Sequence, residues 1–343
     1  MNFASDNTTG AAPEILAAIA ETNAGRLMPY GNDDLTRAAE QAVADLFETE
    51  AKVFFVATGT AANSLALSAM APAWGGIYCH QAAHINDSEC GAPEFFSGGA
   101  KLMPLQGANG KIAARDLDAA LAAVPPGRVH HVKPAAVSIT QATEAGTLYT
   151  LAEVKAIAEV CRGRGVRLHM DGARFANAVA RLGCSPAEAT WKAGVEALSF
   201  GATKNGALTA EAVVLFADDL ARDFAFRRKR SGHLFSKMRL LSAQMAAYVK
   251  DDLWLRNGRQ ANAMAARMAE GLAAIEGVSL TQPVEANILF PRLTPAIIKG
   301  LKKDGFGFYE RGGQGVVRLV MAYDTRPEDV DAFLASARRH AKG

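Results

Sequence analysis

The sequence lacks the features that mark several large classes of protein. No apolar run approaches the ~20 residues that cross a membrane, and residues 1–6 lack the basic and then apolar pattern of a secretion signal. The formal net charge is only +2, and the basic residues are dispersed except at 227–230, which we interpret as an exposed helix face. These absences predict a soluble, cytoplasmic protein that binds neither membrane nor nucleic acid.

Cysteine is scarce, and its spacing carries no pattern. The four cysteines are Cys79, Cys90, Cys161 and Cys184. Because their spacing matches neither a metal site nor a disulfide framework, we expect free thiols in a reducing compartment and no bound metal. The chain also has neither the G-x-x-x-x-G-K-[ST] nor the G-x-G-x-x-G pattern. A nucleotide-binding protein is therefore disfavoured.

The main candidate for a catalytic residue is a lysine at the end of a predicted strand. The apolar run 195–200 is followed by Gly-Ala-Thr-Lys-Asn-Gly at 201–206, which is typical of a strand that enters a turn. A lysine held there among apolar residues has its ammonium desolvated, which lowers its pKa and makes it a nucleophile toward an aldehyde. Lys204 is that residue, although an exposed lysine in a turn would have the same local sequence.

A second predicted strand ends in an acid. Residues 166–170 are mostly apolar and lead to Asp171, which is followed by Gly-Ala-Arg at 172–174. An acid at one strand end and a lysine at a later one are the two groups that pyridoxal phosphate needs, because one keeps the pyridinium nitrogen protonated and the other carries the aldehyde. Asp171 and Lys204 together therefore predict pyridoxal phosphate as the cofactor.

A glycine-bearing turn follows the strand predicted at 52–58. It contains Gly59 and Thr60 and leads into a helical pattern of apolar residues. The amino terminus of a helix offers free backbone N–H groups and a partial positive charge to an anion. We predict that Gly59 and Thr60 cradle the phosphate.

Strands and helices alternate along the first two thirds of the chain. Strands predicted at 77–80 and 132–140 and an amphipathic helix at 151–162 favour a parallel sheet with helices on both faces. His84 follows the strand at 77–80, where a hydrogen-bonded structural histidine is also common. Ligands of such sheets bind at the carboxyl ends of the strands. The residues that fall at those ends are Gly59, His84, Asp171 and Lys204.

We expect two domains, at 1–245 and 246–343. A chain of 343 residues is long enough for two hydrophobic cores. The second domain shows the alternation of a small α/β domain. A helical stretch predicted over 242–270 leads out of the first domain, and the elements predicted after it are strands at 286–290 and 316–321 and helices at 294–303 and 326–340.

One arginine lies inside the apolar strand predicted at 316–321. A desolvated guanidinium requires a carboxylate or an equivalent partner. For Arg318 this partner is either an acid of the protein or the carboxylate of a bound amino acid.

Two motifs together resemble one known family. Asp-Gly-Ala-Arg at 171–174 and Ser-Asp-Asn-Thr at 5–8 resemble the low-specificity L-threonine aldolase family, and the resemblance covers nearly the whole chain. The family has the fold of the aspartate-aminotransferase-type pyridoxal-phosphate enzymes. The resemblance implies a large domain over 1–245, with a mainly parallel sheet and an amino-terminal arm, and a smaller carboxyl-terminal α/β domain over 246–343.

The resemblance also implies roles for single residues. Lys204 would form the Schiff base with the cofactor, and His84 would stack on the cofactor ring and act as a base. Lys237 or Arg239 would reach the cofactor phosphate of a neighbouring subunit. The full set of implied cofactor contacts is Gly59, Thr60, His84, Asp171, Arg174, Thr203, Lys204 and Lys237, and the implied substrate contacts are Ser5, Arg174 and Arg318.

The implied reaction is cleavage of the Cα–Cβ bond of L-threonine, L-allo-threonine and related β-hydroxy-α-amino acids to glycine and an aldehyde. The implied assembly is a homodimer or homotetramer with active sites at the dimer interface. Three alternatives stay open: a phenylserine aldolase, another pyridoxal-phosphate β-eliminating lyase or aminotransferase, and a non-catalytic ligand-binding relative. The presence of Lys204 argues against the last of these.

The chain departs from the family at two places. Residues 85–87 are Ile-Asn-Asp, where relatives often have an aromatic residue. Many relatives have a Glu-Asn-Thr-His-Asn-Gly segment where this chain has Gln-Ala-Thr-Glu-Ala-Gly at 141–146, without the histidine. If that histidine transfers a proton elsewhere, then Glu144, Gln141 or water takes its place, and the aldehyde preference differs. Glu144 could equally be an exposed loop acid.

Overall fold

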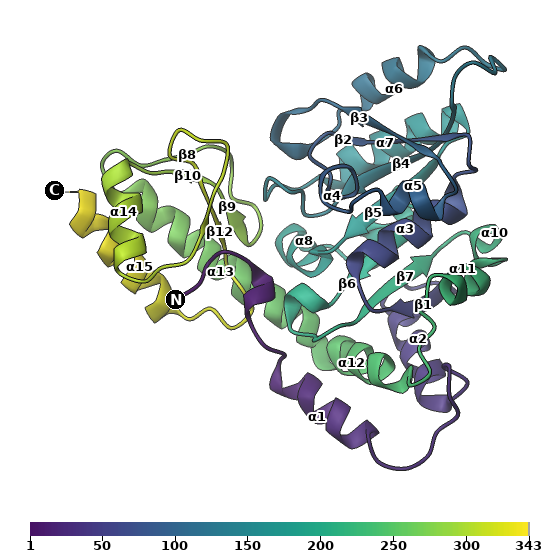
Figure 1. Ribbon diagram of the computed structural model, residues 1–343, viewed down its shortest axis with the longest axis horizontal. Coiled ribbons are helices and arrows are strands. Elements are labelled where there is room, and N and C mark those ends of the chain that lie inside the picture. The colour runs from purple at the N-terminus through teal and green to yellow at the C-terminus, as the bar shows by residue number, and fades with distance from the viewer. Residues whose placement is uncertain (342–343) are drawn as a thin grey trace.

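The large lobe contains the main sheet. The computed structural model describes residues 1–341, which form a large and a small lobe (Figure 1). The strands of the large lobe are β1 (Lys52–Val56), β2 (Gly75–His80), β3 (Lys101–Leu105), β4 (Lys133–Thr140), β5 (Arg167–Gly172), β6 (Ala197–Gly201) and β7 (Glu211–Leu215). Within the described residues they form one seven-stranded sheet in the order β1-β7-β6-β5-β4-β2-β3. Only β7 runs antiparallel to its neighbours there, so the predicted mainly parallel α/β fold is confirmed.

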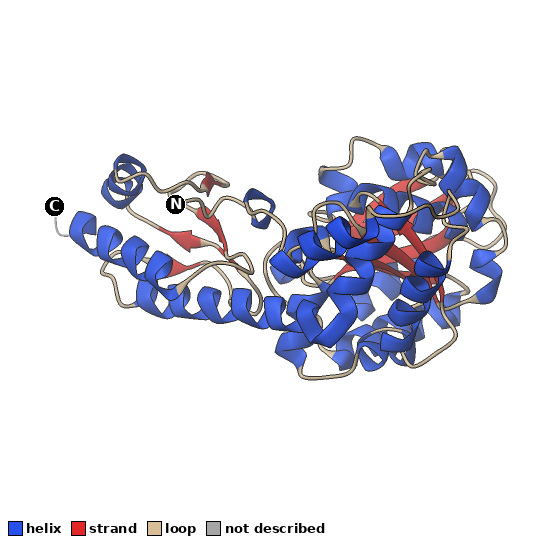
Figure 2. Ribbon diagram, turned by 90° about the horizontal axis from the view of Figure 1, so that it is seen from below, coloured by secondary structure: helices blue, strands red, loops and turns tan. Residues whose placement is uncertain are grey.

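Helices cover both faces of this sheet (Figure 2). On one face lie α3 (Gly59–Met70), α10 (Asp218–Ala221) and α11 (Phe224–Arg230). On the other face lie α1 (Pro13–Thr22), α2 (Asp34–Leu46), α6 (Ala114–Ala122), α7 (Leu151–Arg164), α8 (Phe175–Leu182) and α12 (Arg239–Val249). Each layer buries an apolar face against the sheet, which is the arrangement that stabilises this class of fold. No helix within residues 1–341 combines the length and apolar character needed to cross a membrane.

Short polar sequences decide where several of these helices begin. Asp33 accepts a hydrogen bond from the Thr36 N–H (2.8 Å) and caps α2. Thr58 accepts one from the Ala61 N–H (3.2 Å) and caps α3. Side-chain caps of this kind satisfy backbone donors that have no partner inside the helix. The start of α3, which contains the predicted phosphate cradle, is therefore fixed by local sequence.

Alternation along β5 decides which side chains face α3. Leu168 and Met170 enter the core beneath the opposite layer of helices. Because side chains alternate between the faces of a strand, Asp171 points to the face that α3 covers. Asn63 of α3 confirms this orientation, since its side-chain amide donates a hydrogen bond to Asp171 (2.9 Å).

The small lobe follows the helix α13 (Leu253–Ala273), which spans both lobes (Figure 1). Its other elements are β8 (Ser279–Leu280), β9 (Ile288–Leu289), β10 (Pro291–Arg292), α14 (Pro295–Lys303), β11 (Tyr309–Glu310), β12 (Val317–Val320) and α15 (Pro327–Ala341). The predicted alternation of strands and helices is confirmed. Among the described residues, β11, β12 and β9 pair into a small antiparallel sheet.

The single helical stretch predicted over 242–270 is wrong. The structure divides it into α12 and α13, which are separated by a short 3-10 turn at Lys250–Asp252. Asp251 and Asp252 have φ angles of 51° and 54°. Aspartate tolerates this left-handed conformation better than most residues, whereas a continuous α-helix requires a negative φ. The apolar periodicity continues across the break, so it did not reveal the break.

The amino-terminal arm packs on the small lobe. Phe3 belongs to the same hydrophobic core as Leu319 and Phe333. The Phe3 N–H donates to the Gly307 carbonyl (2.7 Å), and the Val320 N–H donates to the Phe3 carbonyl (2.8 Å). Residues near both ends of the chain therefore meet beside the main sheet. The division into domains at 1–245 and 246–343 stays a prediction.

One member of the basic run at 227–230 differs from the expected exposed helix face. Arg228 is buried, with its guanidinium carbon 5.2 Å from the centre of the Phe54 ring. Burial lowers the pKa of Arg228, and the nearby Glu40 acts in the opposite direction. The sequence run was misleading here because the turn of α11 directs one of its four basic residues inward.

Candidate active site

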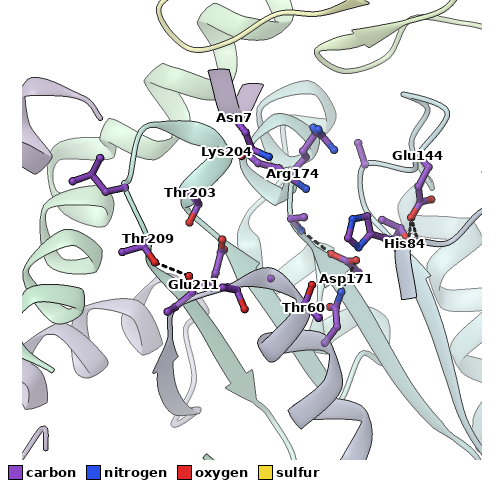
Figure 3. A pocket seen from close by; sticks show the side chains of 18 residues that line it. Asn7, Thr60, His84, Glu144, Asp171, Arg174, Thr203, Lys204, Thr209 and Glu211 are labelled. Atoms are coloured by element: carbon purple, nitrogen blue, oxygen red, sulfur yellow. Dashed lines mark hydrogen bonds between the residues drawn. The ribbon is translucent and has the colours of Figure 1, made fainter. Parts of the chain in front are cut away.

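A cavity opens at the edge of the main sheet where parallel strands such as β4, β5 and β6 have their carboxyl ends. It has a volume of about 380 Å³, within the range of about 300–1,000 Å³ that is usual for small-molecule sites. The predicted residues that line it are Gly59, Thr60, His84, Asp171, Arg174, Thr203 and Lys204 (Figure 3). The structure therefore brings together side chains that are up to 145 positions apart in the sequence, counting from Gly59 to Lys204.

Lys204 lies in a short 3-10 turn, Thr203–Asn205, just after β6. Gly206 ends this turn with a φ of 108°, a conformation that a residue with a Cβ rarely adopts. Burial lowers the pKa of Lys204, and the positive charge of Arg174 lowers it further. The side chain faces the cavity (Figure 3). These are the conditions under which an amine becomes a nucleophile.

Asp171 is held firmly at the end of β5. One carboxylate oxygen accepts from the Ala173 N–H (3.0 Å), and the other accepts from the Asn63 amide (2.9 Å). The residue is only 3% exposed. Asn63 also donates to Glu89 (2.8 Å) and so joins two buried carboxylates. This fixed carboxylate can form an ion pair with a protonated ring nitrogen.

The amino terminus of α3 presents backbone N–H groups beside the cavity. The first residues of a helix have no partners inside the helix for their N–H groups, and Gly59 and Thr60 occupy these positions beside the cavity. A Cβ added at Gly59 would have no neighbour within 4 Å, so the backbone is open on that side. The local geometry suits a phosphate group.

His84 begins the short helix α4 (His84–Asp87) after β2. Its Nδ1 lies 2.8 Å from the Glu89 carboxylate, and its ring lies beside Asp171 at the cavity (Figure 3). The His84 backbone N–H donates to the Glu144 carboxylate (2.8 Å). Burial raises the pKa of Glu89, and that of Glu144 to about 7. Glu144 is thus not the exposed loop acid that the sequence allowed.

A second cavity adjoins the first on the side of the small lobe. The two share Asn7, His84, Glu144, Arg174 and Lys204. The second cavity adds Ser5 from the amino-terminal arm and Arg318 from β12, two of the predicted substrate contacts. The amino-terminal arm, the small lobe and the edge of the main sheet therefore meet in one continuous site.

The two predicted substrate arginines have different partners. Arg174 forms a two-pronged ion pair with Asp6 (2.7 and 2.9 Å). Burial alone would raise the pKa of Asp6, but Arg174 and Lys204 outweigh it and the pKa is lowered. Arg318 donates to the Ala4 carbonyl (3.0 Å) but forms no ion pair with an acid in residues 1–341. The sequence allowed an ion pair between Arg318 and an acid of the protein. The structure instead pairs Arg174 with an acid, Asp6.

Burial of Arg318 is not offset by an ion pair with an acid in residues 1–341, and this burial acts on its pKa. It lowers the pKa of Arg318 to about 10, and Arg174 contributes to the same shift. The guanidinium stays charged at neutral pH and lines the second cavity. A half-buried cation of this kind is well suited to bind an anionic group of a ligand.

Two predicted residues lie outside both cavities. Lys237 and Tyr30 line a separate hollow. Of the residues that line this hollow, only Leu208 and Thr209 also line the first cavity. Arg239 donates to the Gly25 carbonyl (3.3 Å) at the surface. The contact of either residue with the phosphate of a neighbouring subunit stays a prediction.

Several residues of the site were missed by sequence reasoning. Glu211 begins β7, and because β7 is antiparallel, its first residue lies at the same edge as the carboxyl ends of β5 and β6. An acid in an otherwise apolar strand was a usable signal, the same one that indicated Arg318. Asn63, Glu89 and Asp6 gave no comparable signal, because their partners come from distant segments.

Comparisons with known proteins agree with this geometry. A family model described as beta-eliminating lyase matches residues 2–294. A low specificity L-threonine aldolase of Pseudomonas aeruginosa is 48% identical over 96% of this chain and 94% of its own length. The chain belongs to the low-specificity L-threonine aldolase family. The enzyme of that name from a Pseudomonas species is 44% identical over 98% of this chain and 96% of its own length.

A solved structure agrees with the family assignment. The threonine aldolase of Leishmania major has 30% identity, a TM-score of 0.93, and coverage of 99% of both chains. Serine palmitoyltransferase of Sphingomonas wittichii, at 16% identity and a TM-score of 0.75 over all of this chain, shares the fold. The low-specificity L-threonine aldolases are pyridoxal-phosphate-dependent lyases, and the residues of this chain fit that cofactor. The site offers a carboxylate, an amine and an open helix amino terminus around one cavity.

Proposed function

We propose that this chain cleaves the Cα–Cβ bond of L-threonine, L-allo-threonine and related β-hydroxy-α-amino acids to give glycine and an aldehyde. The observation that carries the proposal is the convergence of Lys204 and Asp171 on one cavity beside Arg318, which forms no ion pair within residues 1–341. The first two suit pyridoxal phosphate, and the third suits the carboxylate of an amino acid.

Three groups of this chain would hold the cofactor. The amine of Lys204 would bond to its aldehyde, Asp171 would face its ring nitrogen, and the N–H groups of Gly59 and Thr60 would bind its phosphate. His84 would pack against the ring, and Arg174 and Thr203 would complete the contacts. Once bound, pyridoxal phosphate supplies an electron sink for the charge that develops at Cα.

The cationic side of the site would orient the substrate. Arg318, with Ser5 and Arg174 beside it, would hold the carboxylate of the amino acid. Because a fixed carboxylate limits rotation about the bonds to Cα, it decides which of those bonds is aligned for cleavage. The position of the bound substrate, rather than an additional chemical group, would therefore select the Cα–Cβ bond over the other bonds to Cα.

Cleavage also requires a group that accepts the proton of the β-hydroxyl. Positioned acids and bases contribute about 10² to 10⁴ in rate. His84, which the sequence indicates, and its neighbour Glu144 both line the two cavities. The lining of the second cavity also includes the apolar residues Ile288 and Phe290, which supports acceptance of β-substituents larger than methyl, such as the phenyl group of phenylserine.

The test is an assay of products from two substrates. We expect the purified protein with pyridoxal phosphate to release acetaldehyde from L-threonine and benzaldehyde from phenylserine, with glycine in equal amounts. Release of ammonia and a keto acid would instead indicate β-elimination or transamination. Saturation with ligand and no product would indicate a binding relative. The ratio of the two aldehyde rates decides between a threonine and a phenylserine preference.

Assembly and location follow from the same proposal. The family resemblance supports a homodimer or homotetramer with sites at the dimer interface, in which Lys237 or Arg239 reaches the partner's phosphate. It also supports action on free amino acids in the cytoplasm. Sedimentation of the protein at several concentrations checks the first point.

A further inference from the structure

Glu144 occupies an unusual position between the two cavities. It lies on the loop after β4 and lines both cavities together with His84 and Lys204 (Figure 3). Its Oε1 accepts hydrogen bonds from the His84 backbone N–H (2.8 Å) and the Thr140 hydroxyl (3.0 Å). Its Oε2 is buried and has no hydrogen-bond partner within residues 1–341. One oxygen therefore anchors the carboxylate, and the other keeps an unused acceptor position.

A free buried carboxylate oxygen is costly for the folded state. Leaving a buried acceptor without a partner costs about 1–3 kcal/mol, and more for a charged group, so such an oxygen in a native structure calls for an explanation. Glu89 and Glu94 also have an unpartnered oxygen, but neither lines the two cavities. Glu144 alone of these three acids combines an unpartnered oxygen with a place in the lining of both cavities.

Of the other candidates for the same task, Gln141 is already engaged, and His84 is engaged through one of its two ring nitrogens. Gln141 uses its side-chain amide on the backbone of Tyr149 (2.8 and 3.0 Å) and lines neither cavity. The Nδ1 of His84 is engaged with Glu89 (2.8 Å). Burial, helped by the charge of Asp171, raises the pKa of Glu144 to about 7. A group with a pKa near the working pH is the most effective general base.

We infer that Glu144 is the catalytic base of this chain: its Oε2 accepts the β-hydroxyl proton of the substrate as the Cα–Cβ bond breaks. The inference rests on the proposed function. The O–H electron pair becomes the second bond of the aldehyde carbonyl, and the Cα–Cβ pair stays on Cα. Cα takes up one proton to form glycine, and Glu144 has taken one proton from the β-hydroxyl, so the reaction consumes and releases no net proton. In this assignment His84 holds Glu144 in place through its backbone N–H and packs against the ring of the cofactor.

The test compares two Glu-to-Gln variants. Glu144→Gln keeps an oxygen that can accept from His84 and Thr140 but cannot take up the proton. Glu94→Gln makes the same change at a buried acid outside both cavities and serves as the matched control. For the wild type we expect kcat/KM for aldehyde release to fall about tenfold per pH unit below pH 7. For Glu144→Gln we expect a loss of about 10² to 10⁴-fold and no such acid limb, and Glu94→Gln should match the wild type.

A second measurement does not depend on turnover. In protein labelled with carbon-13 at the glutamate carboxyls, nuclear magnetic resonance should show several carboxyls that titrate near pH 7 in the wild type, because burial raises the pKa of Glu40, Glu144 and Glu211 to about 7. One of these titrations should be missing in Glu144→Gln. The visible absorbance of bound cofactor should be the same in both proteins. If Glu144→Gln does not retain the cofactor, Glu144→Asp takes its place; it should be slower than the wild type and keep the acid limb.

The outcomes separate the inference from the proposed function. If Glu144→Gln keeps a rate within about threefold of the wild type and the same acid limb, the assignment of Glu144 is overturned while the aldolase proposal stands. The same holds if no resonance that titrates near pH 7 is lost in that variant. If the wild type releases no aldehyde from either substrate, the proposed function itself fails. A flat pH profile with full cofactor absorbance in Glu144→Gln supports Glu144.

Discussion

The two sides of the site differ in the charged groups that they add and come from different parts of the chain. The edge of the main sheet contributes acids, of which Glu144, Asp171 and Glu211 line the first cavity. The side toward the small lobe contributes guanidiniums, of which Arg311 and Arg318 line the second. An amino acid that lies across both has its carboxylate among the cations and its reacting bonds near the acids. We therefore expect this asymmetry to orient the substrate before any bond changes.

The charged groups on the two sides also differ in what they can do. Guanidiniums do not release protons near neutral pH, so they bind without taking part in acid–base steps. Burial brings the pKa of both Glu144 and Glu211 to about 7, where a carboxyl group readily gains or loses a proton. We therefore expect the cationic side to act in substrate recognition and the acidic side in proton transfer. Four variants test this division.

The largest effect is expected at Lys204, which lies between the two sides. Among the described residues it is the one amine that lines the two cavities. Lys204→Ala should lower kcat by about 10⁴-fold or more, the scale seen when a covalent catalytic residue is lost. It should also remove the visible absorbance of the bound cofactor after gel filtration. Retention of both absorbance and aldehyde release would contradict its role.

The next effect is expected on the cationic side. Arg318→Ala removes a half-buried charge that has no acid partner in residues 1–341, and loss of one member of a buried charge pair costs about 2–5 kcal/mol. We expect a loss in kcat/KM of about 30- to 4,000-fold, mostly as a higher KM, with cofactor absorbance unchanged. Arg318→Lys should recover part of it, since lysine keeps the charge but not the planar fork.

Arg292→Ala is the matched control for Arg318. Arg292 lies on β10 of the same lobe, is exposed, and donates only to Gln314 (3.3 Å) among the described residues. This variant should keep the wild-type KM. An equal rise of KM in both variants would mean that the small lobe responds to any lost arginine, and the recognition role of Arg318 would be wrong.

On the acidic side, Glu211 should make the stability of the protein depend on pH. Burial raises the pKa of Glu211 from 4.5 to about 7, so between these values the folded state binds a proton that the unfolded state does not. Its stabilising contribution is complete below about pH 4.5 and is lost as the pH rises through 7. Over that range the free energy of unfolding should fall by about 3 kcal/mol because of this group.

Glu211→Gln isolates this contribution. The free energy of unfolding of the variant should not show the decrease that Glu211 causes in the wild type. The difference in this free energy, variant minus wild type, should therefore increase by about 3 kcal/mol between pH 4.5 and pH 8. Urea denaturation of the cofactor-free proteins at the two pH values measures it. A difference between the two proteins that does not change with pH would show that Glu211 is ionised at neutral pH in the folded state.

The smallest effect is expected at Asn63, which links two acids of the sheet edge. Asn63→Ala leaves one oxygen of Asp171 and one of Glu89 without this donor, at a cost of about 1–3 kcal/mol. We expect cofactor affinity, measured by absorbance titration, to fall by about tenfold. Asn262→Ala, which breaks a pair with Asn177 outside the cavity (3.0 Å), should cost stability without this loss of affinity. Equal affinities in the two variants would contradict the linking role.

The sequence by itself determined the features that depend on neighbouring residues. The strand and turn around Lys204, the end of β5 at Asp171 and the capped start of α3 are each encoded within about ten residues, because hydrogen bonding and periodicity act over that distance. The mainly parallel sheet followed from the alternation of these elements. Arg318 was found because a charge in an apolar strand must have a partner.

Only the tertiary structure decided which groups share the site. The antiparallel direction of β7 brings Glu211 to the carboxyl ends of its neighbours, and the amino-terminal arm brings Asp6 to Arg174 rather than to Arg318. The free oxygen of Glu144 is likewise a result of packing. These facts depend on contacts between residues far apart in the chain, which leave no mark in the local pattern. Local sequence therefore fixed the cofactor chemistry, whereas long-range packing fixed the charges around it.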